Sequence, residues 1–227
     1  AANGCTFARY WLHNGFITVD NEKMSKSLGN FFTVRDIAKH FPYEVIRFFI
    51  LNGHYRSPIN FSDELMKACQ NGLERIKNAR KELNFYIKNV ADTKMTAEEA
   101  AKEAELNGYK EQFEAAMDDD FNTADAVSAI YELVRFSNTE IKAGASREFA
   151  EKIQDMLDHL CGGLGIAEVA EEEVSDEDVA KIEALISERT EAKKAKDFAK
   201  ADAIRDELAA MGITIKDTRQ GVQWFRG

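Results

Sequence analysis

Residues 62–87 read SDELMKACQNGLERIKNARKELNFYI, and this stretch determines the fold class. Its apolar side chains recur at intervals of three and four residues, at Leu65, Cys69, Leu73, Ile76, Ala79, Leu83 and Ile87. That spacing places them on one face of a long amphipathic helix. Such a face needs a partner to cover it, so the stretch predicts a helical assembly.

Three more helices are predicted before residue 166. Thr96 to Glu99 fits a capping box at the start of the second helix. The third and fourth carry apolar stripes, formed by Val127, Ile130, Tyr131, Val134 and Ile141, and by Phe149, Ile153, Leu157, Leu160 and Leu164. The short connections favour an antiparallel bundle over residues 61–165.

Residues 1–60 have a different pattern. Phe16–Val19 is a short β-type run, and it is followed by the turn signal Asp20-Asn21. Two short helices are expected next, one before Pro42 and one through Val45–Leu51.

The end of the chain predicts a small separate module. Residues 166–174 are acidic and are expected to be a linker. Residues 175–227 predict two helices, the first capped by Ser175–Asp178, and a hairpin of two strands.

Composition excludes several classes of protein. The net charge of −10 speaks against a generic nucleic-acid binder, although Arg189–Lys200 is locally basic. There is neither a signal peptide nor a membrane-spanning stretch, so we expect a cytoplasmic protein. Cys5, Cys69 and Cys161 are far apart, so we expect reduced thiols and no metal site in these residues. The first residue is not Met, which suggests a fragment.

Lys23-Met24-Ser25-Lys26-Ser27 is the stretch most informative about chemistry. Two ammonium groups and two hydroxyls in one polar loop suit a multiply charged phosphate. For two arbitrary lysines, a solvated surface loop would be the simpler interpretation. The whole string, however, is identical to the KMSKS signature of class I aminoacyl-tRNA synthetases, which Leu28-Gly29-Asn30 extends.

This resemblance implies a loop that closes over ATP with its Mg²⁺, and that follows the last part of a class I nucleotide-binding domain. Lys26 would contact the triphosphate and stabilise the charge that develops on the departing pyrophosphate. Lys23 would support the phosphates, and Met24, Ser25 and Ser27 would complete the ATP-binding loop. The expected fold is mainly α: the end of the nucleotide-binding domain (1–60), the bundle (61–165), and a small α+β anticodon-binding module (175–227).

Other stretches resemble cysteinyl-tRNA synthetases in particular. They are Tyr10–Gly15, Arg47–Phe49, Gly53–Ser57, Met117–Thr123, Ala195–Phe198, Ala201-Asp202 and Gln220–Trp224. This resemblance implies cysteine and tRNA(Cys) as substrates, no membrane, and a monomer. No HIGH-type signature is present, and the family's zinc ligands would lie before this start. We therefore expect zinc only in the longer parent protein, and no activity from this chain alone.

Individual residues near the loop leave alternatives open. His13 is interpreted either as a packing histidine or as part of the amino-acid pocket, and its neighbour Trp11 as a core residue. Arg56 is either a tRNA phosphate contact or one half of a surface ion pair. Asp118-Asp119-Asp120 is expected to favour the start of the next helix rather than to bind metal.

The terminal module supplies the other predicted tRNA contacts. Lys193 and Lys194 would meet phosphates or base edges, and Asp202 and Asp217 would accept hydrogen bonds from base amino groups. Phe198 and Trp224 would stack on unpaired bases. For each of these residues, surface solvation or core packing is the alternative.

Two other functions would leave part of this sequence without a use. A freestanding RNA-binding adaptor derived from a synthetase would have no use for a phosphate-binding loop. A ligase that joins cysteine to an aminosugar would have no use for an anticodon-binding module.

Overall fold

The computed structural model describes residue 4 and residues 6–167, 176–195, 197–211, 213–218 and 221–226. The chain divides into two compact units, residues 1–168 and 169–227. The boundary falls within the expected linker, most of which lies outside the described residues.

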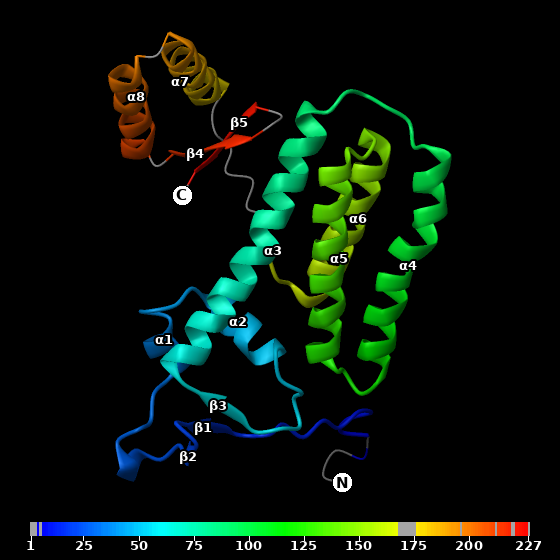
Figure 1. Ribbon diagram of the computed structural model, residues 1–227. Coiled ribbons are helices and arrows are strands. Elements are labelled where there is room, and N and C mark those ends of the chain that lie inside the picture. The colour runs from blue at the N-terminus through cyan, green and yellow to red at the C-terminus, as the bar shows by residue number, and fades with distance from the viewer. Residues whose placement is uncertain are drawn as a thin grey trace. The chain divides into compact units, whose positions relative to one another are not determined.

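Four long helices form most of the first unit (Figure 1). They are α3 (Asp63–Asn89), α4 (Ala97–Asp118), α5 (Thr123–Ala143) and α6 (Arg147–Leu164). Successive helices run in opposite directions, and α5 packs against each of the other three. The predicted antiparallel bundle is confirmed.

Local signals set where these helices begin and end. Ser62 caps α3 by accepting a hydrogen bond from the Leu65 amide, and Thr96 and Glu99 form the predicted capping box of α4. Gly144 and Gly165 follow α5 and α6 with φ of 89° and 61°. Glycine adopts this left-handed conformation without strain, which ends each helix.

The bundle core contains most of the predicted stripes. Leu73, Ile76 and Leu83 of α3 are at most 2% exposed, as are Ile130 of α5 and Leu157 of α6. Burying one such side chain contributes about 1.5–3 kcal/mol. The prediction for the apolar face of α3 was wrong at one end, because Leu65 is 44% exposed while the adjacent Met66 is fully buried. The buried face of α3 therefore begins at Met66, which keeps the helical spacing to Leu73 and Ile76.

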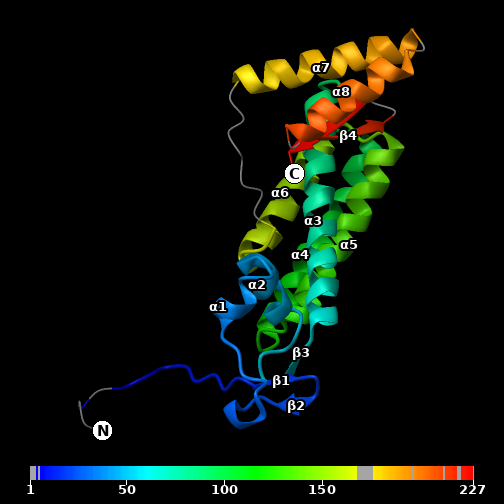
Figure 2. The same cartoon turned by 90° about the vertical axis from the view of Figure 1, so that its left-hand side faces the viewer.

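The residues before the bundle form two short helices and a small sheet. α1 (Val34–Ile37) and α2 (Tyr43–Leu51) confirm the prediction, and Phe48 of α2 is buried in the bundle core. Strand β1 (Ile17–Val19) pairs antiparallel with β2 (Glu22–Lys23) and parallel with β3 (Ile59–Phe61). Figures 1 and 2 both place this sheet at the end of the bundle where α3 begins.

The second unit is the predicted pair of helices followed by a hairpin. It comprises α7 (Asp176–Lys194), α8 (Phe198–Ala210), β4 (Ile213–Thr218) and β5 (Gly221–Arg226). The strands pair antiparallel, from Ile213 with Arg226 to Thr218 with Gly221. Ile182, Ile204, Leu208 and Ile213 form its buried core. The cap predicted at Ser175 lies outside the described residues.

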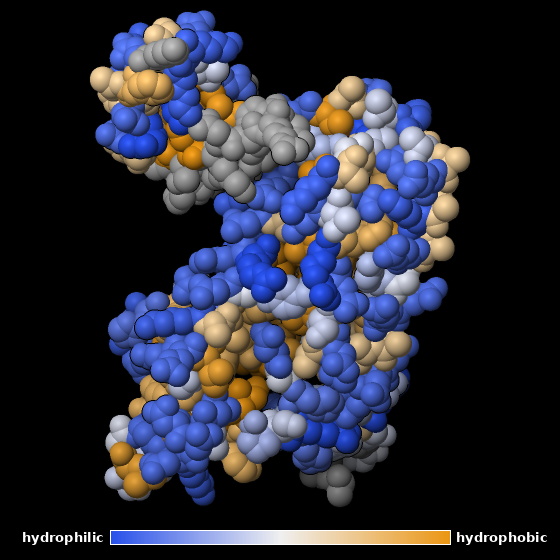
Figure 3. Space-filling model, viewed as in Figure 1, coloured by the Kyte–Doolittle hydropathy of each residue, from blue (hydrophilic) through white to orange (hydrophobic). Residues whose placement is uncertain are grey.

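The surface of the first unit is uneven in character. Figure 3 shows mainly hydrophilic side chains over the bundle helices, and apolar ones gathered near α2 and at the tip beyond β2. Most of the large hydrophobic residues that are exposed precede residue 51, among them Tyr10, Trp11 and Phe16. No helix within the described ranges is long and apolar enough to cross a membrane.

Candidate functional site

The lysine loop, residues 23–30, begins at the last residue of β2 and is anchored by the sheet. Asp20 and Asn21 join β1 to β2 with φ of 50° and 65°, a left-handed turn that Asp and Asn tolerate better than most residues. The Asn60 Oδ1 atom on β3 accepts hydrogen bonds from the Asn21 amide at 2.7 Å and from Thr18 Oγ1 at 3.1 Å. The Asp20 amide donates to the Phe61 carbonyl at 3.1 Å. β3 therefore fixes the turn from which the loop starts.

The centre of the loop is a single 3-10 turn, η1 (Lys26–Leu28). Ser25 caps it, because its Oγ accepts a hydrogen bond from the Ser27 amide at 3.2 Å. The two serine hydroxyls lie 2.6 Å apart. Gly29 ends the turn with φ of 70°, and its amide donates to the Lys26 carbonyl at 3.3 Å. The two serines therefore shape the loop, whereas the sequence had suggested them only as hydrogen-bond donors to phosphate.

Asn30 closes the loop, and no sequence prediction included it as a site residue. Its Oδ1 accepts a hydrogen bond from the Ser25 amide at 2.8 Å, and its Nδ2 donates to the Lys23 carbonyl at 3.2 Å. A signal was available, since asparagine next to glycine in a polar stretch is typical of side chains that bond to nearby backbone.

The two lysines of the loop are exposed, whereas Met24 and Ser25 are half-buried. The Lys26 ammonium lies 5.4 Å from the centre of the Phe31 ring, within the range of a cation–π contact. Among the ion pairs of the described residues, none involves Lys23 or Lys26. Both charges are therefore available to an anionic ligand from solvent.

His13 and Trp11, which precede β1, are both more exposed than expected. Trp11 is 65% exposed and its ring is tilted against that of Phe7, with ring centres 5.8 Å apart, so the prediction of a core residue was wrong. His13 is also exposed in the described part of the chain and packs against no core there. Both residues precede β1, where the described part of the chain provides no buried core for them.

Arg56 lies in a cluster that joins the 53–58 loop to the corner between α4 and α5. The Tyr55 hydroxyl donates to Asp120 Oδ1 at 2.8 Å, and Arg56 Nε lies 2.9 Å from Asp120 Oδ2. His54 stacks on Tyr55 at 5.0 Å. The hydrogen bond to Tyr55, together with the charge of Asp120, raises the pKa of the Arg56 guanidinium. This geometry matches the ion-pair alternative for Arg56, whose side chain is still 64% exposed.

The aspartate run does not cap α5. Asn122 does so, by accepting a hydrogen bond from the Asp125 amide, whereas Asp118 ends α4 and Asp119 follows it. Asp120 faces the Tyr55 and Arg56 side chains instead. The prediction failed because Asp120 is engaged by residues more than sixty positions earlier in the chain, which no local pattern reveals.

The residues of the second unit that were predicted to contact tRNA differ in how exposed their side chains are. Lys193 and Lys194 lie in the last turn of α7, Lys194 is exposed, and Phe198 at the start of α8 is 64% exposed. Asp202 is exposed and lies 3.3 Å from Arg205. Trp224 is partly buried against the core of the unit, and the rest of its side chain is exposed. The side chain of Asp217 lies outside the described residues.

The described cysteines do not suit zinc. Burial raises the pKa of the Cys69 thiol, and it raises the pKa of Cys161 to about 12. Zinc binds the thiolate form. Within the ranges that the structure describes, no three His, Cys, Asp or Glu side chains gather as a metal site. Cys5 lies outside the described residues.

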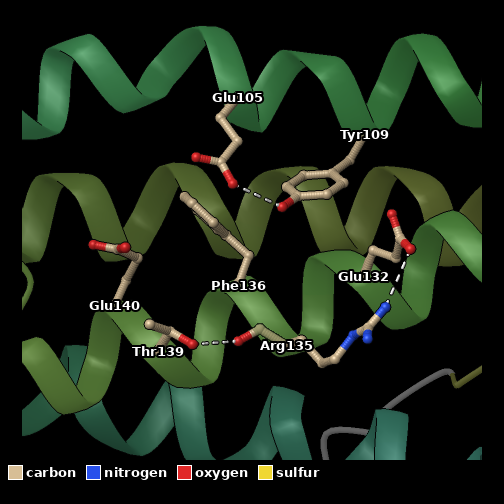
Figure 4. A pocket seen from close by; sticks show the side chains of 7 residues that line it. All are labelled: Glu105, Tyr109, Glu132, Arg135, Phe136, Thr139 and Glu140. Carbon is tan, nitrogen blue, oxygen red and sulfur yellow. Dashed lines mark hydrogen bonds and ion pairs between the residues drawn. The ribbon is translucent and has the colours of Figure 1, made fainter.

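A shallow pocket of about 370 Å³ lies between α4 and α5 (Figure 4). Glu105 accepts a hydrogen bond from the Tyr109 hydroxyl at 3.1 Å, and Arg135 pairs with Glu132 at 3.1 Å. Burial, followed by the nearby Glu105, raises the pKa of Tyr109 to about 12, so the phenol stays neutral. These polar groups pair with each other, so the pocket shows no group set up for catalysis.

Three family models match successive parts of the chain. They are described as tRNA synthetases class I (C) catalytic domain, over residues 1–71, DALR domain, over 112–168, and Cysteinyl-tRNA ligase anticodon binding domain, over 176–224. Among solved structures, the LeuRS–tRNA–LeuAMS ternary complex of Agrobacterium radiobacter K84 agnB2 LeuRS aligns with a TM-score of 0.53 and 21% identity. That alignment covers 66% of this chain and 20% of the other, and it concerns the fold alone. The three family models, together with the lysine loop, therefore indicate part of a class I aminoacyl-tRNA synthetase.

Comparison with curated relatives indicates which synthetases of this class the chain is similar to. The chain is 50% identical over 226 residues to the cysteine–tRNA ligase of Lachnospira eligens, and 48% identical over 226 residues to that of Clostridioides difficile. These alignments cover 100% of this chain, but 47% and 48% of the relatives. The chain belongs to the cysteine–tRNA ligase family, and it spans about half the length of the curated relatives it matches.

Proposed function

We propose that the chain provides the ATP-facing loop and the tRNA-binding parts of a cysteine–tRNA ligase. In that reaction a carboxylate oxygen of cysteine attacks the α-phosphorus of ATP, forming cysteinyl-adenylate and releasing pyrophosphate. A ribose hydroxyl of tRNA(Cys) then attacks the carbonyl carbon and releases AMP. A cytoplasmic location follows from this role in protein synthesis.

The observation that carries the proposal is the closed loop with its two exposed lysines. In the first step, negative charge moves onto the departing pyrophosphate. A cation already in position there stabilises the transition state more than the ground state. We assign Lys26 to that charge, Lys23 to the neighbouring phosphates, and Ser25, Ser27 and Met24 to the frame that holds them. No described residue is assigned to the Mg²⁺ that accompanies ATP.

The other site residues have supporting roles in the proposal. His13 is exposed on the segment that leads into β1 and would be part of the amino-acid pocket. Arg56 would combine its pairing with Asp120 with a contact to tRNA. Lys193, Lys194, Phe198, Asp202, Asp217 and Trp224 would contact the anticodon arm. The match of residues 176–224 to an anticodon-binding domain supports this role over the aminosugar ligase, and the lysine loop supports it over the adaptor.

The proposal is tested by cysteine-dependent exchange of pyrophosphate into ATP, measured on a full-length ligase that carries this sequence. Lys26→Ala should lower kcat by about 10²–10³-fold, while the KM for cysteine changes little. Lys67→Ala, which removes an exposed lysine of α3, is the matched control and should leave both constants unchanged. The chain alone is expected to be inactive.

Two outcomes would contradict this view. If the full-length ligase showed no cysteine-dependent exchange, the assigned reaction would be wrong. If Lys26→Ala raised the KM for ATP without lowering kcat, the loop would supply ground-state binding and not transition-state stabilisation.

A further inference from the structure

We propose that Asn30 is a positioning residue of the lysine loop, and that it acts on the reaction through Lys26. This inference rests on the proposed function, because it concerns how the same loop presents its charge to the triphosphate.

The first argument is the geometry of the asparagine side chain. Its amide bridges the two sides of the loop, with the Ser25 N–H at 2.8 Å from Oδ1 and the Lys23 carbonyl at 3.2 Å from Nδ2. These partners also fix which way the amide faces, since only its oxygen can accept and only its nitrogen can donate. Asn30 is itself half-buried in a loop whose tip is exposed.

The second argument is what this bridge does to Lys26. Ser25, directly before it, is held on its amide side by Asn30 and on its carbonyl side by the Leu28 amide at 3.2 Å. The Ser25 hydroxyl caps the turn in which Lys26 is the first residue. The backbone at Lys26 is therefore held in one conformation, which sets the direction in which the lysine side chain leaves the loop. That conformation depends on the Asn30 bridge.

The third argument is that few side chains could replace asparagine here. Aspartate would keep an acceptor for the Ser25 amide, but would place a carboxylate against the Lys23 carbonyl and beside the two lysines. Alanine would remove both bonds. The left-handed Gly29 turns the chain back so that the next side chain reaches Ser25 and Lys23. Asparagine therefore uses its Nδ2 donor, its Oδ1 acceptor and its short side chain in this bridge.

A double-substitution cycle on the full-length ligase tests the inference, with pyrophosphate exchange as the measurement. Asn30→Ala removes both hydrogen bonds of the bridge, and we expect kcat to fall about tenfold. In the Lys26→Ala background the same change should lower kcat less than about twofold, because the group that Asn30 positions is already gone. Asn89→Ala, at the far end of α3, is the control and should have no effect in either background.

An equal loss in both backgrounds, or no loss in either, would overturn the inference while leaving the proposed function intact. A second measurement needs no activity. In the isolated chain, the Ser25 amide should exchange its hydrogen more slowly than the Lys26 amide, and Asn30→Ala should abolish the difference. If Ser25 and Lys26 exchanged equally fast in the unsubstituted chain, the bridge would not persist in solution and Asn30 would not position the loop.

Discussion

Glu99 connects the starts of two bundle helices through one carboxylate. Its Oε2 accepts a hydrogen bond from the Thr96 amide at 2.7 Å, within the capping box of α4. Its Oε1 accepts from the amide of Ser146, the cap of α6, at 2.6 Å. Burial opposes ionisation of this group, but the hydrogen bonds from Thr96 and Ser146 outweigh it and lower the pKa of Glu99. The charged form is therefore the one that the fold requires.

The first stability prediction concerns Glu99→Gln. The amide replaces one acceptor oxygen by a donor, which then faces a backbone N–H, so the variant should lose about 1–3 kcal/mol of unfolding free energy at neutral pH. A folded-state pKa that is lowered contributes stability above the ordinary value of 4.5, and that stability is lost as the pH falls below it. The difference between variant and parent should therefore shrink in acid.

Urea unfolding of the chain, followed at neutral pH and at several pH values below 4.5, measures this difference. Glu98→Gln is the control, because it changes the neighbouring exposed glutamate and should cost only a few tenths of a kcal/mol. A Glu99→Gln variant whose deficit stayed constant down to low pH would show that the carboxylate charge is not what stabilises the capped ends.

Residues with local partners were the ones the sequence could predict. The bond between Thr96 and Glu99 spans three positions, so its pattern is visible in the sequence. The partner of Asp120 is more than sixty positions away, and the partners of Asn30 are backbone groups that any residue carries. The error at Trp11 has a related cause, since an apolar side chain does not say which surface is present to cover it.

At the scale of elements, two close contacts hold the 53–58 loop between the sheet and the bundle. The Gly15 amide, just before β1, donates to the Tyr55 carbonyl at 2.7 Å. A β-carbon at Gly15 would lie 2.3 Å from the Ser57 carbonyl oxygen, so only glycine permits this approach. On the other side, Asp120 accepts hydrogen bonds from Tyr55 and Arg56. The loop therefore connects β1 to the α4–α5 corner.

Asp120→Asn should loosen this connection without disturbing the corner itself. Asparagine tolerates the φ of 55° that Asp120 adopts, so the backbone can be kept while the charge is lost. Because Arg56 is largely exposed, the expected cost in stability is below about 1 kcal/mol. Amide hydrogen exchange across residues 53–58 should nevertheless become faster, and high salt should partly mimic the change in the parent chain.

Asp119→Asn provides the control for this prediction, because Asp119 is exposed and has a negative φ of −80°, unlike Asp120. Unchanged exchange at 53–58 in Asp120→Asn would mean that Gly15 and the β3 pairing are enough to hold the loop.

The elements themselves were predictable to very different degrees. The bundle helices were evident from periodicity, because each buries one face against neighbours close in sequence. β3 was missed, since three residues after Pro58 give no strand pattern, and their pairing with β1 spans about forty positions. That unpredicted strand, through Asn60, anchors the turn that leads into the lysine loop. The sequence therefore revealed the chemistry of the loop but not the support beneath it.

At the scale of the whole molecule, the charge of −10 affects how RNA would be recognised. A strongly acidic chain repels the phosphate backbone over a distance of about a Debye length, so non-specific binding should be weak. Cations such as Lys194, at the end of α7, would then supply local attraction. Aspartates of the second unit have the wrong sign for phosphates, so any role they have in RNA binding must be base recognition.

A titration of the chain with the anticodon stem-loop of tRNA(Cys), and with anticodon-mutated versions at two salt concentrations, tests that division of roles. Asp202→Ala should weaken binding of the cognate stem-loop by about 1–3 kcal/mol and should relax discrimination between anticodons. Its ion pair with Arg205 is exposed, so stability should hardly change. Asp206→Ala is the control on the same helix, with a side chain 76% exposed, and should leave discrimination intact.

Lys194→Ala should weaken all stem-loops alike and reduce the salt slope by about one. Parent curves that coincide for cognate and mutated stem-loops would exclude base recognition by this unit and would favour an adaptor that binds RNA without reading the anticodon.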